Sequence, residues 1–378
     1  MLLSKGFEIE MYTGTPQGEI VGLSDRIVAD LNGFVREPDS RNVEYTTAPL
    51  CRYESLLCEL VQPRQRLRQY LKGLGDYTLI PGSTLSLGGG DRFYRSDPKN
   101  PYHGYIEKTY GTKVVTASIH INIGIADPEV LMRACRLVRL EAPLYLALSA
   151  SSPFFNGQVT GSHSTRWQVF PQTPEFVPLF ESHRHYIDWT QEQLAKGTMQ
   201  NVRHLWSSVR PNGDRRPYNL NRLELRICDL VTDPIALLGI TALLEARLWQ
   251  LIGDPGLDPL LLCDNRQGLV ALTTTNEEAV AQSSLDASLT HWQDGRSILA
   301  REWIEELYDQ VWPVAKQKGF SCFLSPVKKI LRQGNESLRW LQDYQRYGNL
   351  EQVMQQAIAH TEREEQEMAD HLCHPLVA

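Results

Sequence analysis

The sequence has no excess of positive charge. Its 45 Asp and Glu residues outnumber its 38 Lys and Arg residues, and the formal net charge is −7. Nucleic-acid-binding proteins usually carry a basic stripe, so we expect no nucleic-acid partner. The chain also has no apolar run of the ~18–20 residues that a membrane helix requires. Its start, MLLSKGFEIEMY, is too short and too acidic for a signal peptide. We therefore expect a cytoplasmic protein without a membrane partner.

Cysteines are few and show no pairing pattern. The seven cysteines are an odd number and form no C-x-x-C pair. Most of them lie in apolar runs such as LRICDLV and FSCFLS. This usage is typical of reduced thiols in a reducing compartment, so we expect neither a disulfide nor a zinc site.

Several well-known catalytic motifs are also missing. The sequence contains no G-x-x-x-x-G-K-[ST] loop, no G-x-S-x-G elbow, no H-E-x-x-H helix and no Rossmann glycine fingerprint. His163, His183 and His185 lack metal-ligand spacing on a clear element, so we interpret them as surface or loop residues. P-loop enzymes, serine hydrolases of the elbow type and zinc proteases are thereby excluded.

The pattern of elements indicates an α+β fold. With 378 residues, the chain can bury a large core without disulfides or structural metals. We find no linker, and we expect one catalytic body over 1–378, with the active-site strands in 1–255 and a mainly helical part over 256–378. A long irregular stretch covers 81–104, and such loops are usually functional. Apolar periodicity predicts strands at 5–12, 42–48, 113–125 and 222–230, and helices at 20–34, 53–72, 128–150, 181–196, 235–252 and from about 298 onward.

Four of the predicted strand segments carry polar side chains at spacing two, which places them on one face of a sheet. The opposite face of each strand is apolar, as in ASIHINIGI and RLELRICD. One sheet face can therefore pack on a core while the other forms a polar floor. The side chains expected on that floor are Glu8, Glu10, Glu44, His120, Asn122, Glu224 and Arg226.

Taken singly, these residues have ordinary explanations. Glu8 and Glu10 fit the solvated face of an edge strand, His120 fits a structural histidine, and Glu224 with Arg226 fits a surface ion pair. Together, the carboxylates would repel one another unless cations lay among them. Clusters rich in oxygen suit Mg²⁺ or Mn²⁺, and such ions bridge nucleotide phosphates. The candidate metal ligands are Glu8, Glu10, Glu44, His120 and Glu224, and the candidate arginines for phosphate or carboxylate are Arg166, Arg210 and Arg226.

Five segments in order, GFEIEMYTG, NVEYTTAP, ASIHINIGI, ALSASSPFFNG…GSHSTRWQVF and RLELRICD, resemble the glutamate–cysteine ligases of the cyanobacterial type. These belong to the carboxylate–amine ligases with a glutamine-synthetase-like fold, and the resemblance spans about residues 5–250. It implies a curved antiparallel sheet that forms an active-site funnel, backed by helices. It also implies that Glu8, His120 and Glu224 share one metal and that Glu10 and Glu44 hold a second or third.

The resemblance further implies roles for the other polar residues. Arg166 and Arg226 match positions that contact the glutamate substrate or the transferring phosphate, and Arg210 matches a third catalytic position less cleanly. Asn122 matches a substrate-binding residue of the floor. Segment 81–104 is a candidate lid over the site, with a plain surface loop as the alternative.

The implied reaction uses ATP, L-glutamate and L-cysteine, with Mg²⁺ or Mn²⁺. ATP phosphorylates the γ-carboxylate of glutamate, and the amine of cysteine then displaces phosphate to give γ-glutamylcysteine, the first step of glutathione synthesis. We expect a monomer or a homodimer. Two other interpretations remain open: a ligase of the same superfamily that uses a different amine, and a non-catalytic protein that binds nucleotide or amino acid.

Overall fold

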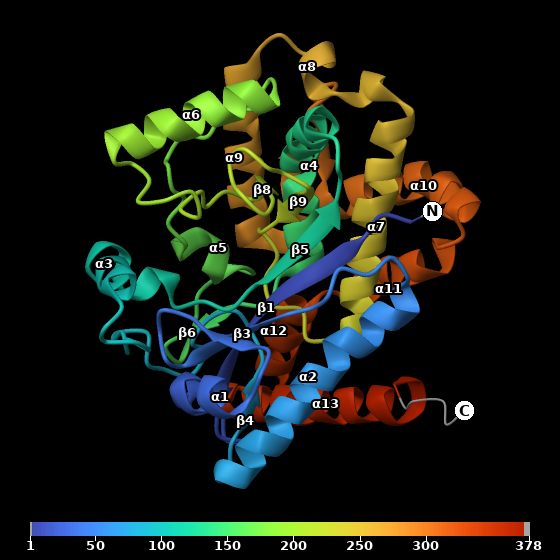
Figure 1. Ribbon diagram of the computed structural model, residues 1–378. Coiled ribbons are helices and arrows are strands. Elements are labelled where there is room, and N and C mark those ends of the chain that lie inside the picture. The colour runs from blue at the N-terminus through green and yellow to red at the C-terminus, as the bar shows by residue number, and fades with distance from the viewer. Residues whose placement is uncertain (1, 374–378) are drawn as a thin grey trace, which may run out of the picture.

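The computed structural model describes residues 2–373 and shows one large sheet surrounded by helices (Figure 1). The strands are β1 (Lys5–Gly14), β2 (Phe34–Arg36), β3 (Asn42–Thr46), β4 (Thr78–Ile80), β5 (Ile119–Gly124), β6 (Phe154–Phe155), β7 (Gln158–Val159), β8 (Val209–Asn212), β9 (Arg222–Leu225), β10 (Ser288–Thr290) and β11 (Ser297–Leu299). The α-helices are α1 (Ser24–Asp30), α2 (Tyr53–Leu74), α3 (Pro101–Tyr110), α4 (Pro128–Ser149), α5 (Thr165–Val169), α6 (His183–Lys196), α7 (Pro234–Gly253), α8 (Pro259–Leu262), α9 (Arg266–Ser283), α10 (Ala300–Lys318), α11 (Ser325–Gln333), α12 (Glu336–Tyr347) and α13 (Leu350–Leu372). Short 3₁₀ turns cover Gly111–Val114, Pro255–Leu257, Ser284–Asp286 and Ser321–Leu324.

The large sheet has the strand order β2-β3-β1-β5-β9-β8, and β4 pairs with the far end of β1. All of its pairs are antiparallel. Strand β1 is central because it pairs with β3 on one side and with β5 on the other. Strands β3, β1 and β5, which come from three separate stretches of the chain, therefore lie side by side in the sheet.

The two faces of the sheet differ as their alternating sequences predict. Ile9, Ile121 and Leu225 are fully buried on the apolar face and belong to the main hydrophobic core. That core includes residues of α4 and α7, and α4 also contacts β8 and β9. Both helices begin at an aspartate N-cap followed by proline, Asp127 for α4 and Asp233 for α7. The side chains at the alternate positions of the same strands form the polar face.

Most predicted elements are confirmed, and the differences have local causes. The predicted helix at 20–34 is α1, which spans only Ser24–Asp30, because the chain then turns into β2. The predicted strand at 113–125 begins at Ile119, since residues 111–114 form a 3₁₀ turn. The predicted strand at 222–230 ends at Leu225. Strands β2, β4 and β8 were not predicted because each has only three or four residues, too few to show a period.

Helix α7, predicted at 235–252, is long and apolar enough by length and composition to cross a membrane. An 18-residue stretch of this helix has a mean hydropathy of 1.6, and 72 % of that stretch is buried inside the protein. Its neighbours are α2, α4, α10 and α11. These contacts are those of a core helix.

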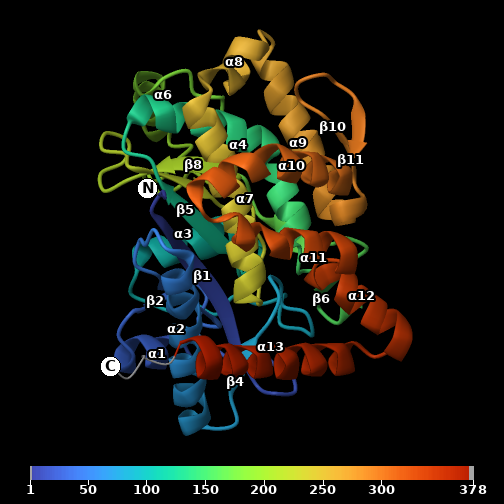
Figure 2. The same cartoon turned by 90° about the vertical axis from the view of Figure 1, so that its right-hand side faces the viewer.

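The last helix, α13, crosses α2 and packs against it, as Figure 2 shows. The pairing is charged: Glu365 of α13 accepts hydrogen bonds from Arg64 and Arg68 of α2. Cys58 on α2 and Cys373 just beyond α13 form a disulfide. The interpretation of all seven cysteines as reduced thiols is therefore wrong for this pair. The two cysteines are 315 residues apart, so no sequence spacing indicated that they meet.

Candidate functional site

Strand register brings the predicted polar residues together. On β1, Glu8 lies opposite His120 of β5, and Glu10 lies opposite Glu44 of β3. One strand further, Glu224 of β9 lies opposite Asn122 of β5. Because side chains at spacing two share a face, all of these groups point to the same side of the sheet.

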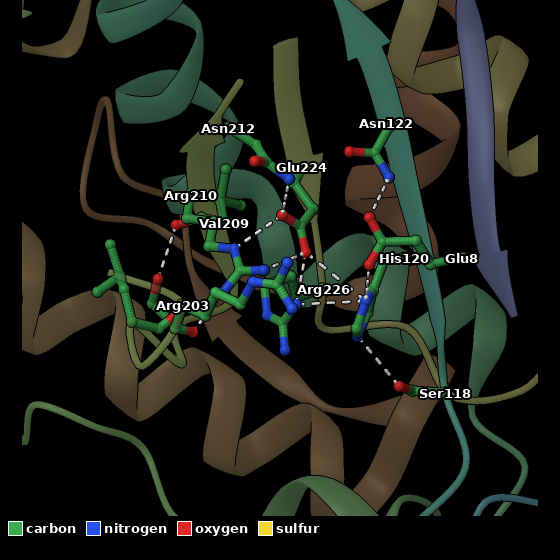
Figure 3. A network of polar contacts seen from close by, with 12 residues as sticks. Glu8, Ser118, His120, Asn122, Arg203, Val209, Arg210, Asn212, Glu224 and Arg226 are labelled. Carbon is green, nitrogen blue, oxygen red and sulfur yellow. Dashed lines mark hydrogen bonds and ion pairs between the residues drawn. The ribbon is translucent and has the colours of Figure 1, made fainter. Parts of the chain in front are cut away.

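Glu8, His120 and Glu224 form a first cluster, shown in Figure 3, whose ligand atoms lie within 4.8 Å of one another. His120 Nδ1 is 3.0 Å from Glu8 Oε2 and 3.6 Å from Glu224 Oε1. Asn122 Nδ2 donates to Glu8 Oε1 at 3.2 Å, and His120 Nε2 lies 3.2 Å from Ser118 Oγ. The predicted grouping of one histidine with two carboxylates is present.

Three donors surround Glu224, which is fully buried. The Arg210 guanidinium binds both carboxylate oxygens, at 2.7 and 2.9 Å, and Asn212 Nδ2 donates at 2.6 Å. Arg226 Nη1 donates to Oε1 as well. Burial alone would raise the pKa of Glu224, but the charges of Arg210, Arg226 and His120 together hold this pKa well below its ordinary value. Glu224 is therefore an ionised carboxylate.

Glu8 is less enclosed, with 23 % of its side chain exposed. Burial and the neighbouring Glu224 would raise its pKa, whereas the hydrogen bond to His120 and the charges of His120 and Arg210 lower it, and the net pKa is lowered. The first cluster thus holds two ionised carboxylates that are already balanced by arginines.

A second cluster lies further along the same strand and consists of Glu10, Glu37 and Glu44. Its ligand atoms also lie within 4.8 Å of one another. Glu37 follows β2 directly and was not predicted. Ser118 Oγ donates to Glu10 Oε2 at 2.7 Å. Within residues 2–373, no Lys or Arg forms an ion pair with this cluster.

Because no basic side chain pairs with the second cluster, the pKa values of two of its carboxyl groups are raised. Burial, reinforced by the charges of Glu8 and Glu10, raises the pKa of Glu44 to about 8. Burial and the charges of Glu10 and Glu44 raise the pKa of Glu37 well above its ordinary value. A cation among these oxygens would remove the repulsion that favours protonation.

Both donor sets fit hard divalent cations. Carboxylate oxygens suit Mg²⁺, and a set that includes one imidazole also suits Mn²⁺. The need for a cation is greater at the second cluster, since arginines already neutralise much of the first. Glu8, His120 and Glu224 would hold one ion, and Glu10, Glu37 and Glu44 would hold another.

Arg166 occupies a different place from the other two arginines. Its guanidinium donates to the main-chain carbonyls of Arg226 and Ile227, each at 3.0 Å, and lies 3.6 Å from Asp229. The side chain is only 2 % exposed, and its hydrogen bonds go to these carbonyls rather than to either carboxylate cluster. In this conformation Arg166 fixes the main chain that carries Arg226.

A cavity of about 520 Å³ opens beside the first cluster. Glu8 and Asn122 line it, and so does Arg222, whose Nε donates to Asn122 Oδ1 at 3.2 Å. Asp214, 3.8 Å from Arg222, contributes a carboxylate to the same wall. Opposite charges side by side are suited to an α-amino acid, which carries both an ammonium and a carboxylate group.

Segment 81–104 was expected to be irregular throughout, but helix α3 begins at Pro101 within it. The part before α3 is held near its middle by the buried ion pair of Arg41 and Asp39. Arg41 binds Asp39 and also donates to the carbonyls of Gly89 and Arg92. Asp39 in turn accepts from the backbone N–H of Tyr94 at 2.9 Å. These contacts connect the segment to the loop that leads from β2 into β3.

Sequence reasoning missed four polar residues of this region. Asn212 lies at the end of β8, a strand too short to show a period. Ser118 precedes β5 by one residue and keeps the spacing of two with His120. That spacing is the signal that could have identified it. The four missed residues are Glu37, Ser118, Asn212 and Arg222.

The fold that carries these clusters is that of the glutamate–cysteine ligases. It resembles the crystal structure of glutamate–cysteine ligase from Francisella tularensis in complex with AMP, with a TM-score of 0.75 and 13 % sequence identity over 98 % of this chain and 90 % of that one. A bifunctional glutathione synthetase from Pasteurella multocida gives a TM-score of 0.74 at 16 % identity, over 98 % of this chain and 53 % of that one. The predicted α+β fold class is thus confirmed.

Sequence comparison identifies the family. The model of glutamate-cysteine ligase family 2 matches residues 4–357, and the chain belongs to this family. A relative from Sorangium cellulosum, named "Putative glutamate--cysteine ligase 2", is 30 % identical over 64 % of this chain, and the alignment spans 62 % of that relative. A relative from Rubrobacter xylanophilus, named "Putative glutamate--cysteine ligase 2-1", is 25 % identical over 92 % of this chain and 90 % of its own length.

Proposed function

We propose that the protein is an ATP-dependent ligase that joins the γ-carboxylate of L-glutamate to the amine of L-cysteine. The observation that carries this proposal is the pair of carboxylate clusters on one sheet face, in a chain that belongs to the glutamate–cysteine ligase family 2. ATP would phosphorylate the γ-carboxylate, giving ADP and γ-glutamyl phosphate. The amine of cysteine would then displace phosphate and form γ-glutamylcysteine.

The two clusters account for the cofactor requirement. Bound Mg²⁺ or Mn²⁺ would neutralise charge on the phosphoryl oxygens of ATP. Glu8, His120 and Glu224 are the proposed ligands of one ion, and Glu10, Glu37 and Glu44 those of the other. The predicted ligand set is kept, and Glu37 is added to it because of its place in the second cluster.

The arginines would act on substrate charge. Arg210 and Arg226 lie against Glu224, where planar guanidinium groups can also donate hydrogen bonds to the oxygens of a transferring phosphate. Arg166 would support Arg226 through its bonds to the main chain. Direct contact of Arg166 with substrate, which the family resemblance implies, would require its guanidinium to leave those carbonyls. Asn122 would orient a substrate group at the edge of the neighbouring cavity.

The protein's setting is part of the proposal. We infer a cytoplasmic enzyme that acts as a monomer or homodimer, with one catalytic body over residues 1–378. The main hydrophobic core supports the single body, because it includes residues from Phe7 to Cys373 and so joins the strand region 1–255 to the helices of 256–378. We also propose segment 81–104 as a lid that excludes water from the acyl phosphate.

The test is production of ADP by the purified chain with Mg²⁺, ATP and L-glutamate, with each of the common amino acids added in turn. Strong stimulation by cysteine alone, with γ-glutamylcysteine found by mass spectrometry, would support the proposal. Stimulation by another amino acid would leave the ligase chemistry and replace the amine. A chain that binds ATP without releasing phosphate in any mixture would be a binding protein, and the proposal would be wrong.

A further inference from the structure

Ser118 lies between the two carboxylate clusters and is hydrogen-bonded to a member of each. Its hydroxyl donates to Glu10 Oε2 at 2.7 Å and lies 3.2 Å from His120 Nε2, a contact that Figure 3 shows. The residue is only 2 % exposed, so the protein rather than bulk water sets its hydrogen bonds. Among residues 2–373, no other side chain outside the clusters is hydrogen-bonded to both of them.

The direction of these two hydrogen bonds follows from the single proton of the serine hydroxyl, which can be donated to only one partner. An ionised carboxylate only accepts, and hydrogen bonds to it are stronger than those to a neutral ring nitrogen. The proton of Ser118 therefore goes to Glu10, which is also the shorter contact. Ser118 Oγ then accepts from His120, so Nε2 of the imidazole carries a proton.

The other ring nitrogen of His120 is contacted by Arg226. Nη1 of Arg226 lies 3.2 Å from His120 Nδ1, and a guanidinium group can donate but cannot accept. A hydrogen bond between them requires a lone pair on Nδ1. Arg226 thus favours, independently of Ser118, the tautomer with its proton on Nε2.

Nδ1 also faces the place where an ion of the first cluster would lie. It is 3.0 Å from Glu8 Oε2 and 3.6 Å from Glu224 Oε1. A proton on Nδ1 could be donated to Glu8, but it would oppose the donor on Arg226 and would block an ion. With Nε2 committed to Ser118, Nδ1 is the nitrogen that can offer a lone pair to a cation, and this is the arrangement in which histidine ligands are usually held.

We propose that Ser118 is a positioning residue for both metal sites. It accepts the Nε2 proton of His120, so that Nδ1 faces the first ion, and it orients Glu10 towards the second. The proposal rests on the metal sites of the proposed function but not on the identity of the amine. Because one hydroxyl holds a ligand of each cluster, its loss should weaken both sites at once, by about tenfold to a hundredfold.

The first test is the tautomer of His120, measured by NMR on the chain labelled with ¹⁵N-histidine, without divalent metal and at a pH at which the ring holds one proton. The signal of His120 is identified by its absence from His120→Asn. We expect the proton on Nε2 in the native chain. In Ser118→Ala it should move towards Nδ1, where Glu8 is the acceptor. Loss of a purely structural serine would leave the tautomer unchanged.

The second test measures bound Mn²⁺ by electron paramagnetic resonance, with the ion alone as the probe and no ATP. The native chain should bind two ions, and Ser118→Ala should bind both at least about tenfold more weakly. Ser118→Thr keeps the hydroxyl and should restore most of the lost affinity. Thr116→Val is the matched control, because it removes a buried hydroxyl that is hydrogen-bonded to neither cluster within residues 2–373, and it should bind as the native chain does.

Two results would overturn the role of Ser118 while leaving the metal sites in place. One is a native His120 whose Nε2 lacks a proton, and the other is a Ser118→Ala chain that binds both ions as tightly as the native chain. Absence of Mn²⁺ binding in the native chain would overturn the metal sites themselves, and this proposal with them. The tautomer of the native chain remains decisive if Ser118→Ala fails to fold.

Discussion

Replacing Glu37 by glutamine should make the metal-free protein more stable and, at the same time, less responsive to magnesium. Glu37, Glu10 and Glu44 lie together without a basic partner, and the pKa of Glu37 is raised well above its ordinary value by burial and by these neighbours. In the metal-free fold Glu37 therefore holds its proton to a higher pH than it does in the unfolded chain. Glutamine has nearly the same shape and is neutral at every pH, so it should resemble the protonated acid.

The size of the effect follows from proton linkage. Between the unfolded pKa of 4.5 and the raised folded pKa, Glu37 is ionised in the unfolded chain and protonated in the fold, so folding takes up a proton. Stability from this group is fully present below the unfolded pKa and is lost as the pH rises towards the folded pKa, by up to about 1.4 kcal/mol per pH unit. Glu37→Gln should lack this loss. Glu44, with a pKa raised to about 8, keeps a similar slope in both proteins.

The assay is thermal unfolding of both proteins at several pH values between about 5 and 8, with and without saturating Mg²⁺. For a chain of 378 residues, 1 kcal/mol corresponds to about 1.3 °C in Tm, so the advantage of the variant should grow by up to about 2 °C per pH unit without metal. With Mg²⁺, the native protein should gain more than the variant, because it offers three carboxylates to the ion. The Mg²⁺ effect should also increase with pH, since protons compete for the same oxygens.

Glu367→Gln serves as the control, because it removes one exposed acid from α13 and should leave both dependences unchanged. Parallel pH curves for the native protein and Glu37→Gln would refute the assignment of a raised pKa to Glu37. An equal Mg²⁺ effect in the two proteins would refute its place among the metal ligands.

Three further predictions concern other parts of the molecule. Glu224→Gln should lower ligase turnover by at least about a hundredfold in the ADP assay, and near-native turnover would contradict the metal assignment. Alanine is a poorer choice, because two buried arginines without their carboxylate would cost about 3–5 kcal/mol. His204, whose pKa burial lowers from 6.5 to about 4, should stay neutral in the fold at pH 6.5, and its contribution to stability should be lost progressively as the pH falls from about 6.5 towards 4. NMR titration checks this, and a midpoint near 6.5 would contradict it. Because Cys58 and Cys373 are paired, thiol titration of the unfolded, unreduced chain should find five free thiols, and titration after reduction should find seven. Seven free thiols in both cases would contradict the disulfide.

The strands that build the site were predictable because their alternation is strong. KGFEIEMY, NVEYT and SIHINIG each alternate over five or more residues, so both the strand and its polar face follow from the sequence. No single strand sequence determines the register, which pairs Glu8 with His120 and Glu10 with Glu44. The sequence therefore predicted which residues share the face, while only the fold shows which of them touch.

Several features that escaped prediction lack a periodic context. Glu37 follows a strand of three residues and precedes a proline, so nothing nearby indicates its face. Asn212 lies in a strand that contains Pro211, a residue that usually argues against a strand. The pair Cys58 and Cys373 depends on the packing of two helices from opposite ends of the chain. Tertiary contacts decide each of these cases.

Strand β1 has a consequence for the spacing of bound ions. Glu8 belongs to one cluster and Glu10 to the other, and they are two residues apart on a strand that is paired on both sides. A strand rises about 3.4 Å per residue, so the main chain holds the two anchor points roughly 7 Å apart. Side-chain repacking can tilt either group but cannot change that interval. Inserting or deleting one residue between them would turn one carboxylate into the apolar core, so the distance between the two clusters can vary only together with the fold itself.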